Sequence, residues 1–265
     1  MGEVLGIDVS HYQLDIDWKK VADAGKRFAI LKAMYEAKSH NKDEYFEANY
    51  KGAGDNGIKR GVYIFIASES IRDPERDARS LLGHLGGRVL EYGIWLDYES
   101  QVLRQQGSKR IEDLTYIYAD LFRQAGYYTG IYCNKDWYDH VISERLKTDF
   151  DFWIARYPKN DTGEYKANSS LRPSYKTAAA WQYSSKGHVP GIKGNVDMDA
   201  DFDGIVDLMA QEPYKKDIYT IAMEVLEGKW GTAKTCPSRE KLLTMAGYDY
   251  KKVQRLVNEL KRRET

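Results

Sequence analysis

The sequence predicts an α/β protein in which five βα units and three further strands close a (β/α)5(β)3 barrel, followed by a small three-helix domain. Short apolar runs alternate five times with segments of helical periodicity, which implies parallel strands joined by right-handed crossovers. Acidic residues recur at the ends of these runs, at Asp8, Asp97 and Asp197. An open doubly wound sheet is the alternative. We favour the barrel, because it gathers the acids at strand C-termini into one active site.

Eight short runs are expected to form the strands, enough to close a barrel. They are Val4–Asp8, Phe28–Ala33, Gly61–Ala67, Gly93–Ser100, Tyr128–Cys133, and FWIARY, TAAAWQY and NVDMD at 152–157, 177–183 and 195–199. Loops rather than helices separate the last three runs.

Five helices are expected between the earlier strands, at Trp18–Ala24, Asp43–Asn56, Pro74–Leu85, Ile111–Gln124 and Lys135–Leu146. Pro74 suits a first helical turn, because its missing N–H would have no partner there. The fourth helix carries an apolar face of 3.6 period, and Gly126 is a plausible residue just beyond its end.

The pattern changes to helices alone after a polar stretch, QEPYKK at 211–216. Helices are expected at Ile218–Leu226, at Ser238–Met245 with Ser238 as N-cap, and at Tyr250–Leu260. We therefore divide the chain into a domain over residues 1–210 and a three-helix domain over residues 217–261.

The amino-acid composition limits the kinds of molecule that the chain is expected to bind. Lys and Arg total 40, as do Asp and Glu, so the net charge indicates neither a nucleic acid nor an anionic membrane as partner. The two cysteines, Cys133 and Cys236, are far apart and are interpreted as free thiols. No signal peptide or membrane-spanning run is recognised, so we expect a soluble chain made inside a cell.

The pair formed by Asp97 and Glu99 is the strongest chemical signal. Residues two apart on a strand point the same way, so both carboxyls should project from the end of a buried strand. Crowded acids do not ionise freely, and a protonated acid beside a carboxylate suits cleavage of a glycosidic bond. A strand that ends in a solvated acidic turn is the structural alternative.

Five motifs together resemble glycoside hydrolase family 25, the muramidases of bacteria, fungi and phages. They are GIDVSHYQ at 6–13, WLDYE at 95–99, GIYCNKDWY at 130–138, WIARY at 153–157 and AAWQYSSKGHVPGIKGNVDMD at 179–199. The resemblance spans residues 1–207 and implies an irregular barrel. It also implies cleavage, with retention, of the β-1,4 bond between N-acetylmuramic acid and N-acetylglucosamine in peptidoglycan.

The same resemblance assigns roles to the acids. Glu99 matches the family's general acid, and Asp97 matches a carboxylate that either attacks the sugar or steadies its 2-acetamido group. Either role suits the separation of about 5 to 5.5 Å typical of retaining enzymes. Asp8 and Asp197 match further acids at the barrel mouth. Each, taken alone, could instead be a strand-end acid bonded to nearby backbone.

Substrate contacts are expected from six other residues by the same matching. They are Lys32, Tyr63, Tyr132, Tyr157, Trp181 and Gln182. The residues AMYEA after Lys32, and Ile64 where the family often has histidine, depart from the family and affect the fit of the substrate.

Neither a metal nor another cofactor is expected. The acidic run from Asp197 to Gly204 has the alternation of a calcium loop, but Ala210 stands where a bidentate Glu is needed. The histidines lack metal-ligand spacing.

The C-terminal segments VLEGKWG and AGYDYKKVQRLVN, at 225–231 and 246–258, resemble a cell-wall-binding repeat of phage lysozymes. That likeness implies recognition of muropeptide, with Trp230, Gly231 and Arg239 as candidate contacts. A core role for Trp230 is the alternative.

The combination predicts a phage endolysin that stays in the host cytoplasm until release and then acts on the cell wall. A bacterial autolysin and a non-catalytic peptidoglycan-binding protein on a hydrolase scaffold are the alternatives. The oligomeric state is left open, including association through a C-terminal module started internally at Met209.

Overall fold

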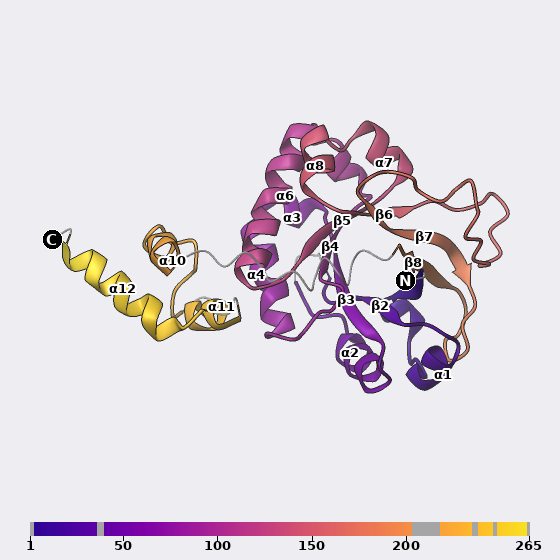
Figure 1. Cartoon of the computed structure of the whole chain (residues 1–265), viewed down its shortest axis with the longest axis horizontal. Helices are drawn as coiled ribbons and strands as arrows, with labels where there is room; N and C mark the ends of the chain where they lie inside the picture. Colours follow the sequence, from indigo (N-terminus) through magenta and orange to yellow (C-terminus); the bar gives the residue numbers. More distant parts are fainter. Residues whose placement is uncertain (1–2, 36–39, 203–217, 235–237, 246–247, 264–265) are drawn as a thin grey trace.

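The computed structural model describes residues 3–35, 40–202, 218–234, 238–245 and 248–263. Eight strands close a barrel in sequence order, from β1 (Val4–Val9) round to β8 (Val196–Asp201). The expected (β/α)5(β)3 architecture is therefore confirmed. Figure 1 shows helices packed around one part of the barrel wall, while β7, β8 and the loop that precedes β7 form the other part.

The first five strands are each followed by helical structure, in parallel pairing from β1 to β7. The strands are β1, β2 (Phe28–Lys32), β3 (Lys59–Phe65), β4 (Ile94–Tyr98) and β5 (Thr129–Asn134). The helices are η1 (His11–Gln13), α1 (Trp18–Asp23), α2 (Phe46–Asp55), α3 (Ser68–Arg72), α4 (Pro74–Leu85), α5 (Gln101–Arg104), α6 (Gly107–Gln124), α7 (Lys135–His140) and α8 (Glu144–Asp149).

The last three strands are β6 (Phe152–Ala155), β7 (Ala178–Gly187) and β8. Strand β8 runs antiparallel to both β7 and β1. The expectation that Asp197 ends a strand is therefore wrong, since it is the second residue of β8. Its reversed direction nevertheless brings Asp197 to the same mouth as the C-terminal end of β1, where Asp8 lies.

Buried side chains pack against both faces of the barrel sheet, inside the barrel and between the sheet and the surrounding helices. The inside holds a cluster of aromatic rings that includes Phe28, Tyr92, Trp95 and Trp153. Gly130 makes room for one of them, because a Cβ at that position would lie 2.3 Å from the ring of Trp95. Burial of this apolar area is the main favourable contribution to folding.

Helix ends follow the capping signals in the sequence. Pro74 opens α4, and Gly126, with φ of 84°, follows the end of α6, as expected. The single helix expected over Lys135–Leu146 is wrong, because α7 and α8 are separate. The Ser143 side chain accepts from the backbone N–H of Leu146 and starts α8 anew.

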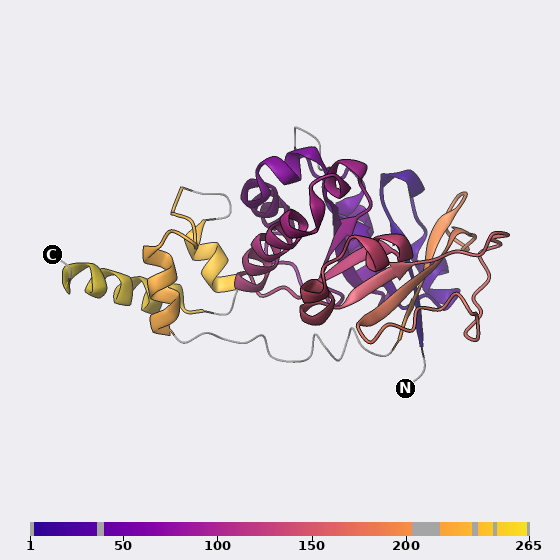
Figure 2. The ribbon, with the colours of Figure 1, turned by 90° about the horizontal axis from the view of Figure 1, so that it is seen from above.

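The C-terminal helices α10 (Ile218–Leu226), α11 (Arg239–Met245) and α12 (Tyr250–Arg263) form a separate group beside the barrel (Figure 1, Figure 2). Ser238 caps α11 by accepting from the N–H of Lys241, as expected. The expected boundary between the domains, the calcium-like residues Asp203 and Gly204, Met209 and Cys236 lie outside the described residues. Within the described ranges, no helix has the length and apolar character needed to cross a bilayer.

Candidate active site

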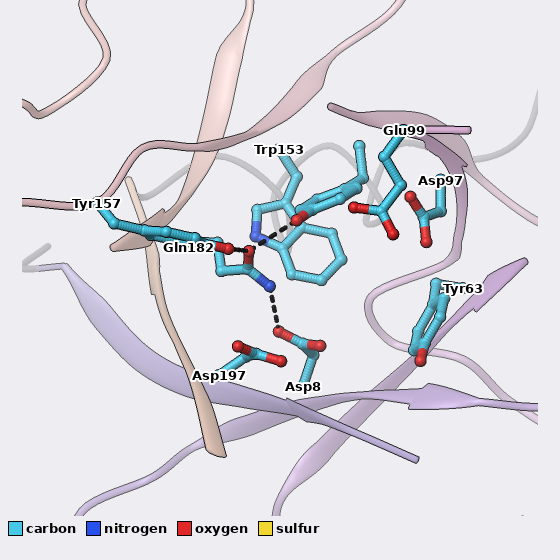
Figure 3. A pocket seen from close by; sticks show the side chains of 9 residues that line it. Asp8, Tyr63, Asp97, Glu99, Trp153, Tyr157, Gln182 and Asp197 are labelled. Carbon is cyan, nitrogen blue, oxygen red and sulfur yellow. Dashed lines mark hydrogen bonds between the residues drawn. The ribbon is translucent and has the colours of Figure 1, made fainter. Parts of the chain in front are cut away.

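A cavity of about 190 Å³ opens at the end of the barrel where β1 to β5 terminate. Figure 3 shows four acids converging on it, together with aromatic and amide side chains. The lining residues are Asp8, Tyr63, Asp97, Glu99, Tyr132, Trp153, Tyr157, Gln182 and Asp197. Eight of these nine are residues that the sequence singles out, so the structure brings most of the predicted site together.

The backbone pairing explains why the acids converge. Asp8 and Asp197 are direct partners in the antiparallel ladder of β1 and β8. Asp97 lies in β4, and Glu99 follows directly after that strand. Because side chains two apart on a strand share a face, both carboxyls reach the cavity.

Glu99 has the properties of a proton donor. Its side chain is exposed at the mouth, but the surrounding protein withdraws the carboxyl from bulk water. This desolvation raises the pKa of Glu99 above its ordinary value, and the charge of Lys32 opposes the rise. The sequence predicts such a rise from crowding by Asp97, whereas desolvation of the carboxyl by the surrounding protein is the main cause here.

Gln182 links Asp8 on one side of the cavity to Tyr132 and Tyr157 on the other through hydrogen bonds. Its Nε2 donates to Oδ2 of Asp8 at 2.6 Å, and its Oε1 accepts from the hydroxyl of Tyr132 at 2.7 Å. The hydroxyl of Tyr157 donates to the same Oε1 (Figure 3). These bonds fix which way the amide points, since only the NH₂ end can donate to a carboxylate.

A second acid lies beneath Asp8. Asp199 lies close enough to Asp8 for its negative charge to disfavour ionisation of Asp8. Burial raises the pKa of Asp8 and of Asp199 well above their ordinary range, and the negative charge of Asp197 adds to both shifts. Trp153 Nε1 donates to Oδ1 of Asp199 at 2.9 Å.

Asp197 is ionised less readily than a surface aspartate. Burial raises its pKa to about 6, and the charges of Glu99 and Asp161 contribute to the rise. Near neutral pH, protonated and ionised carboxyls can therefore be present side by side at the barrel mouth. Acid–base cleavage of a glycosidic bond requires one of each.

Sequence reasoning missed Trp153 and Asp199. Both had a usable signal, because Trp153 is four residues before Tyr157 and Asp199 is two residues after Asp197. Alternation along a strand places each pair on one face.

Lys32 lies at the margin of the cavity. Its Nζ is 5.9 Å from the ring centroid of Tyr63, and its charge reaches Glu99. Trp181 does not reach the cavity, which corrects the expected sugar contact. The ring of Trp181 is buried outside the barrel wall against Tyr165 and Tyr183, because its side chain points the opposite way from that of Gln182.

The candidate wall-binding residues lie together in the C-terminal group, with Trp230 and Gly231 in the turn after α10 and Arg239 at the start of α11. Trp230 is buried, and its Nε1 donates to Oε2 of Glu224 at 2.9 Å, so its ring is a core element and not an open contact surface. The guanidinium of Arg239 donates to the carbonyl oxygen of Gly231 at 2.7 and 3.0 Å. Arg239 thereby fixes the turn that follows Trp230, while contact of Arg239 or Gly231 with a ligand stays a prediction.

The acidic residues do not form a metal site in the part of the chain that the structure describes. Asp197, Asp199 and Asp201 belong to a regular strand, whereas a calcium loop needs its ligands on a curved backbone. Asp201 instead accepts a hydrogen bond from the hydroxyl of Tyr92 at 3.0 Å.

Comparison with known proteins gives matches to two family models. The glycosyl hydrolases family 25 model matches residues 7–192, and the CW_7 repeat model matches residues 219–260. The first match contains Asp8, Asp97 and Glu99. The second contains all three helices α10 to α12 in whole or in part.

Individual relatives agree with the first match. Lysozyme M1 of Streptomyces globisporus is 29% identical over 205 residues, covering 73% of this chain and 66% of its own length. The lysozyme of Streptococcus phage Cp-7 is 31% identical over 191 residues, covering 71% of this chain and 51% of its own. This chain thus spans about half to two thirds of the length of these two relatives.

Among solved structures, the bacterial lysozyme from Streptomyces coelicolor superposes with a TM-score of 0.58 at 26% identity. The superposition covers 80% of this chain and 98% of that structure. Because the family 25 model matches well over half of the residues and the barrel carries the acids of its motifs at one mouth, this chain belongs to glycosyl hydrolases family 25.

Proposed function

We propose that this chain is a peptidoglycan hydrolase, an N-acetylmuramidase that cleaves the β-1,4 bond between N-acetylmuramic acid and N-acetylglucosamine with retention. The observation that carries the proposal is Glu99, a carboxyl of raised pKa that enters the same cavity as Asp97 from one strand end. A carboxyl that stays protonated towards neutral pH can protonate the leaving sugar oxygen.

Asp97 acts on the other side of the anomeric carbon in this proposal. As a carboxylate it stabilises the positive charge that develops there, either by attack on the carbon or by orienting the substrate's acetamide. Asp8 and Asp197 hold substrate or water and set the charge of the mouth. Tyr63, Tyr132, Tyr157 and Gln182 supply ring faces and polar groups for the sugar.

The whole chain acts as a phage endolysin in this proposal. The match to a CW_7 repeat supports a C-terminal module that binds muropeptide and holds the barrel on the polymer, which raises the local concentration of the enzyme. Similarity to a phage lysozyme supports accumulation in the host cytoplasm until release, followed by action on the wall.

The identity of the new chain end tests the reaction. Purified cell walls are digested, reduced with borohydride and hydrolysed to sugars. New muramitol is expected, whereas new glucosaminitol would show a different glycosidase and an unchanged end would show an amidase or a protein that only binds.

A Glu99→Gln variant tests the proton donor. The amide keeps the size of the side chain but cannot donate a proton to an alkoxide, so clearing of a turbid wall suspension should fall by about 100-fold or more. Sedimentation with walls should be unchanged. Clearing at the wild-type rate would overturn the assignment of Glu99.

Retention and the role of Asp97 need separate measurements. Proton NMR of the first product should show the β-anomer before mutarotation. A substrate with a hydroxyl in place of the acetamide on the cleaved muramic acid should remain a substrate only if Asp97 attacks directly.

A further inference from the structure

The short turn after β1 displays an aromatic ring that the active site described above does not use. Tyr12 is 78% exposed, the largest exposed fraction among the large hydrophobic side chains of the described residues. It lies four residues after Asp8, so it is at the rim of the barrel mouth, outside the cavity itself. A single exposed ring is ordinary, but the surroundings of this ring are unusual.

The backbone of the turn is fixed. Ser10 Oγ accepts from the N–H of Tyr12 at 3.3 Å, and Gln13 Oε1 accepts from the N–H of Ser10 at 2.9 Å. The turn ends at Leu14 with φ of 53° and ψ of −140°, a sparsely populated conformation that costs about 1 to 3 kcal/mol for a residue with a side chain. The turn that carries Tyr12 is thus held by side-chain hydrogen bonds, and its strained residue is Leu14.

One buried carboxylate, that of Asp43, lies near both rings that neighbour Tyr12. Asp43 Oδ2 accepts from the backbone N–H of His11 at 3.2 Å and lies 3.1 Å from His11 Nδ1. Burial raises the pKa of the Tyr35 hydroxyl, and the charge of the nearby Asp43 adds to the rise. The ring centroid of His11 is 4.1 Å from that of Tyr12 and 5.1 Å from that of Tyr35, so the three rings form one patch.

This patch is continuous with the cavity. Lys32 lies between them, with Nζ 5.4 Å from the ring centroid of Tyr35 and 5.9 Å from that of Tyr63. Tyr63 itself lines the cavity. In Figure 3, Tyr63 stands on the opposite side of the cavity from Tyr157 and Gln182. The rings therefore lead outward over the ends of β3, β2 and β1.

We propose that Tyr12, His11 and Tyr35 form an outer platform that binds the glycan strand beyond the sugar in the cavity. The platform takes the apolar face of a pyranose on the ring of Tyr12, and the ammonium of Lys32 faces a carboxylate of the muramyl unit next to it. Both partners match the polymer, because its sugars have C–H faces that pack on aromatic rings, and each muramyl unit carries carboxylate on its lactyl group or on the peptide attached to that group.

The platform hypothesis rests on the proposed function. A comparison of short and long substrates tests the platform separately from the hydrolase activity. Binding energy from sugars remote from the cleaved bond should appear in kcat/KM for a long substrate only. The probes are a tetrasaccharide of the glycan strand and the long strand itself, both soluble and freed of other wall polymers.

A Tyr12→Ala variant should lose about tenfold in kcat/KM on the long strand and stay within about twofold of wild type on the tetrasaccharide. Tyr12→Phe should retain the wild-type rate on both, because the ring face and not the hydroxyl makes the contact. Val89→Ala is the matched control, since Val89 is 65% exposed and precedes β4 at the other end of the barrel.

Binding gives a second readout that needs no turnover. In a Glu99→Gln background, Tyr12→Ala should raise the Kd for the long strand about tenfold. Wild-type values for Tyr12→Ala on the long strand, or equal losses on both substrates, would overturn the platform alone. A wild-type chain that cleaves neither substrate would overturn the proposed function together with the platform.

Discussion

Gln182 donates a hydrogen bond from Nε2 to Oδ2 of Asp8 over 2.6 Å, inside the barrel and across 174 residues of sequence. This bond lowers the pKa of Asp8, against burial and the charges of Asp197 and Asp199, which raise it. The Oε1 of the same amide accepts from Tyr132 and Tyr157. One amide thus sets both the charge of an acid and the position of two rings.

Replacing Gln182 with leucine should weaken folding and catalysis together. The change leaves the hydroxyl of Tyr132 without its acceptor and Asp8 without its donor, and an unsatisfied buried polar group costs about 1 to 3 kcal/mol. The free energy of unfolding, measured with urea, should fall by about that amount, and kcat should fall as well.

Tyr157→Phe is the matched control for the leucine variant. It removes one of two donors to the same oxygen and leaves the amide in place, so the loss in unfolding free energy should stay below about 1 kcal/mol. Equal losses in the two variants would show that the amide has no special role.

The rate should fall at high pH as Glu99 loses its proton. Because the protonated form is the donor, the alkaline limb of kcat/KM follows the pKa of Glu99, which is raised from its ordinary value. The charge of Lys32 lowers this pKa, so Lys32→Met should move the alkaline limb to higher pH.

Initial rates on a short soluble substrate, recorded across pH, measure this shift. Lys59→Met is the control, since Lys59 is an exposed residue at the start of β3, at the far end of the barrel. A downward shift in the Lys32 variant would contradict the assignment of Glu99 as the donor.

Asp197→Asn should stabilise the protein above neutral pH while it impairs activity. The pKa of Asp197 is about 6 in the folded chain, against about 3.9 in an unfolded one, so the folded state binds more protons in between. The contribution of this group to stability is therefore lost as the pH rises from about 4 through about 6. Asparagine does not ionise and avoids that loss.

The free energy of unfolding of the asparagine variant should exceed that of the wild type by about 1 to 3 kcal/mol near pH 8, with little difference near pH 4. Urea unfolding at the two pH values measures this. A variant that is less stable than wild type near pH 8 would show that Asp197 has compensating bonds as a carboxylate.

Trp230→Ala should abolish wall binding by unfolding the C-terminal helices. Truncation of a buried tryptophan costs about 3 to 5 kcal/mol, which is comparable to the whole stability of so small a unit. Loss of binding to walls should therefore accompany a loss of helical circular dichroism. Lys251→Ala, at an exposed position of α12, should change neither signal. Full helicity without binding would instead indicate that the indole contacts the ligand.

Periodicity and turn chemistry in the sequence predict much of the fold. The five βα units, the first turn at Pro74 and the end of α6 at Gly126 all follow from local signals. Strand direction does not, because an apolar run such as NVDMD has the same pattern whichever way it is paired. The sequence pattern therefore does not predict the antiparallel course of β8.

The residues of the candidate site likewise fall into those that the sequence predicts and those that it does not. Acids such as Asp97 and Glu99 stand out in the sequence because two carboxyls end an apolar run. Trp153 and Trp181 each lie in a short apolar run, so composition alone could not tell which ring faces the cavity and which faces the outer core. Only alternation, counted from Tyr157 and Gln182, separates them.

The antiparallel closing strand has a consequence for how this barrel tolerates change. Because Asp8 faces Asp197 through main-chain pairing, the position of these two acids depends on the register of β1 and β8 and not on the length of the connection between β7 and β8. Residues inserted at 188–195 would lengthen an external turn and leave the acids in place. A slip of one residue in β8 would turn Asp197, Asp199 and Asp201 to the outside together, since side chains alternate between the two faces of a strand. The turn at residues 188–195 can therefore vary in sequence and length or be engineered. The paired residues of β1 and β8 cannot be shifted in this way.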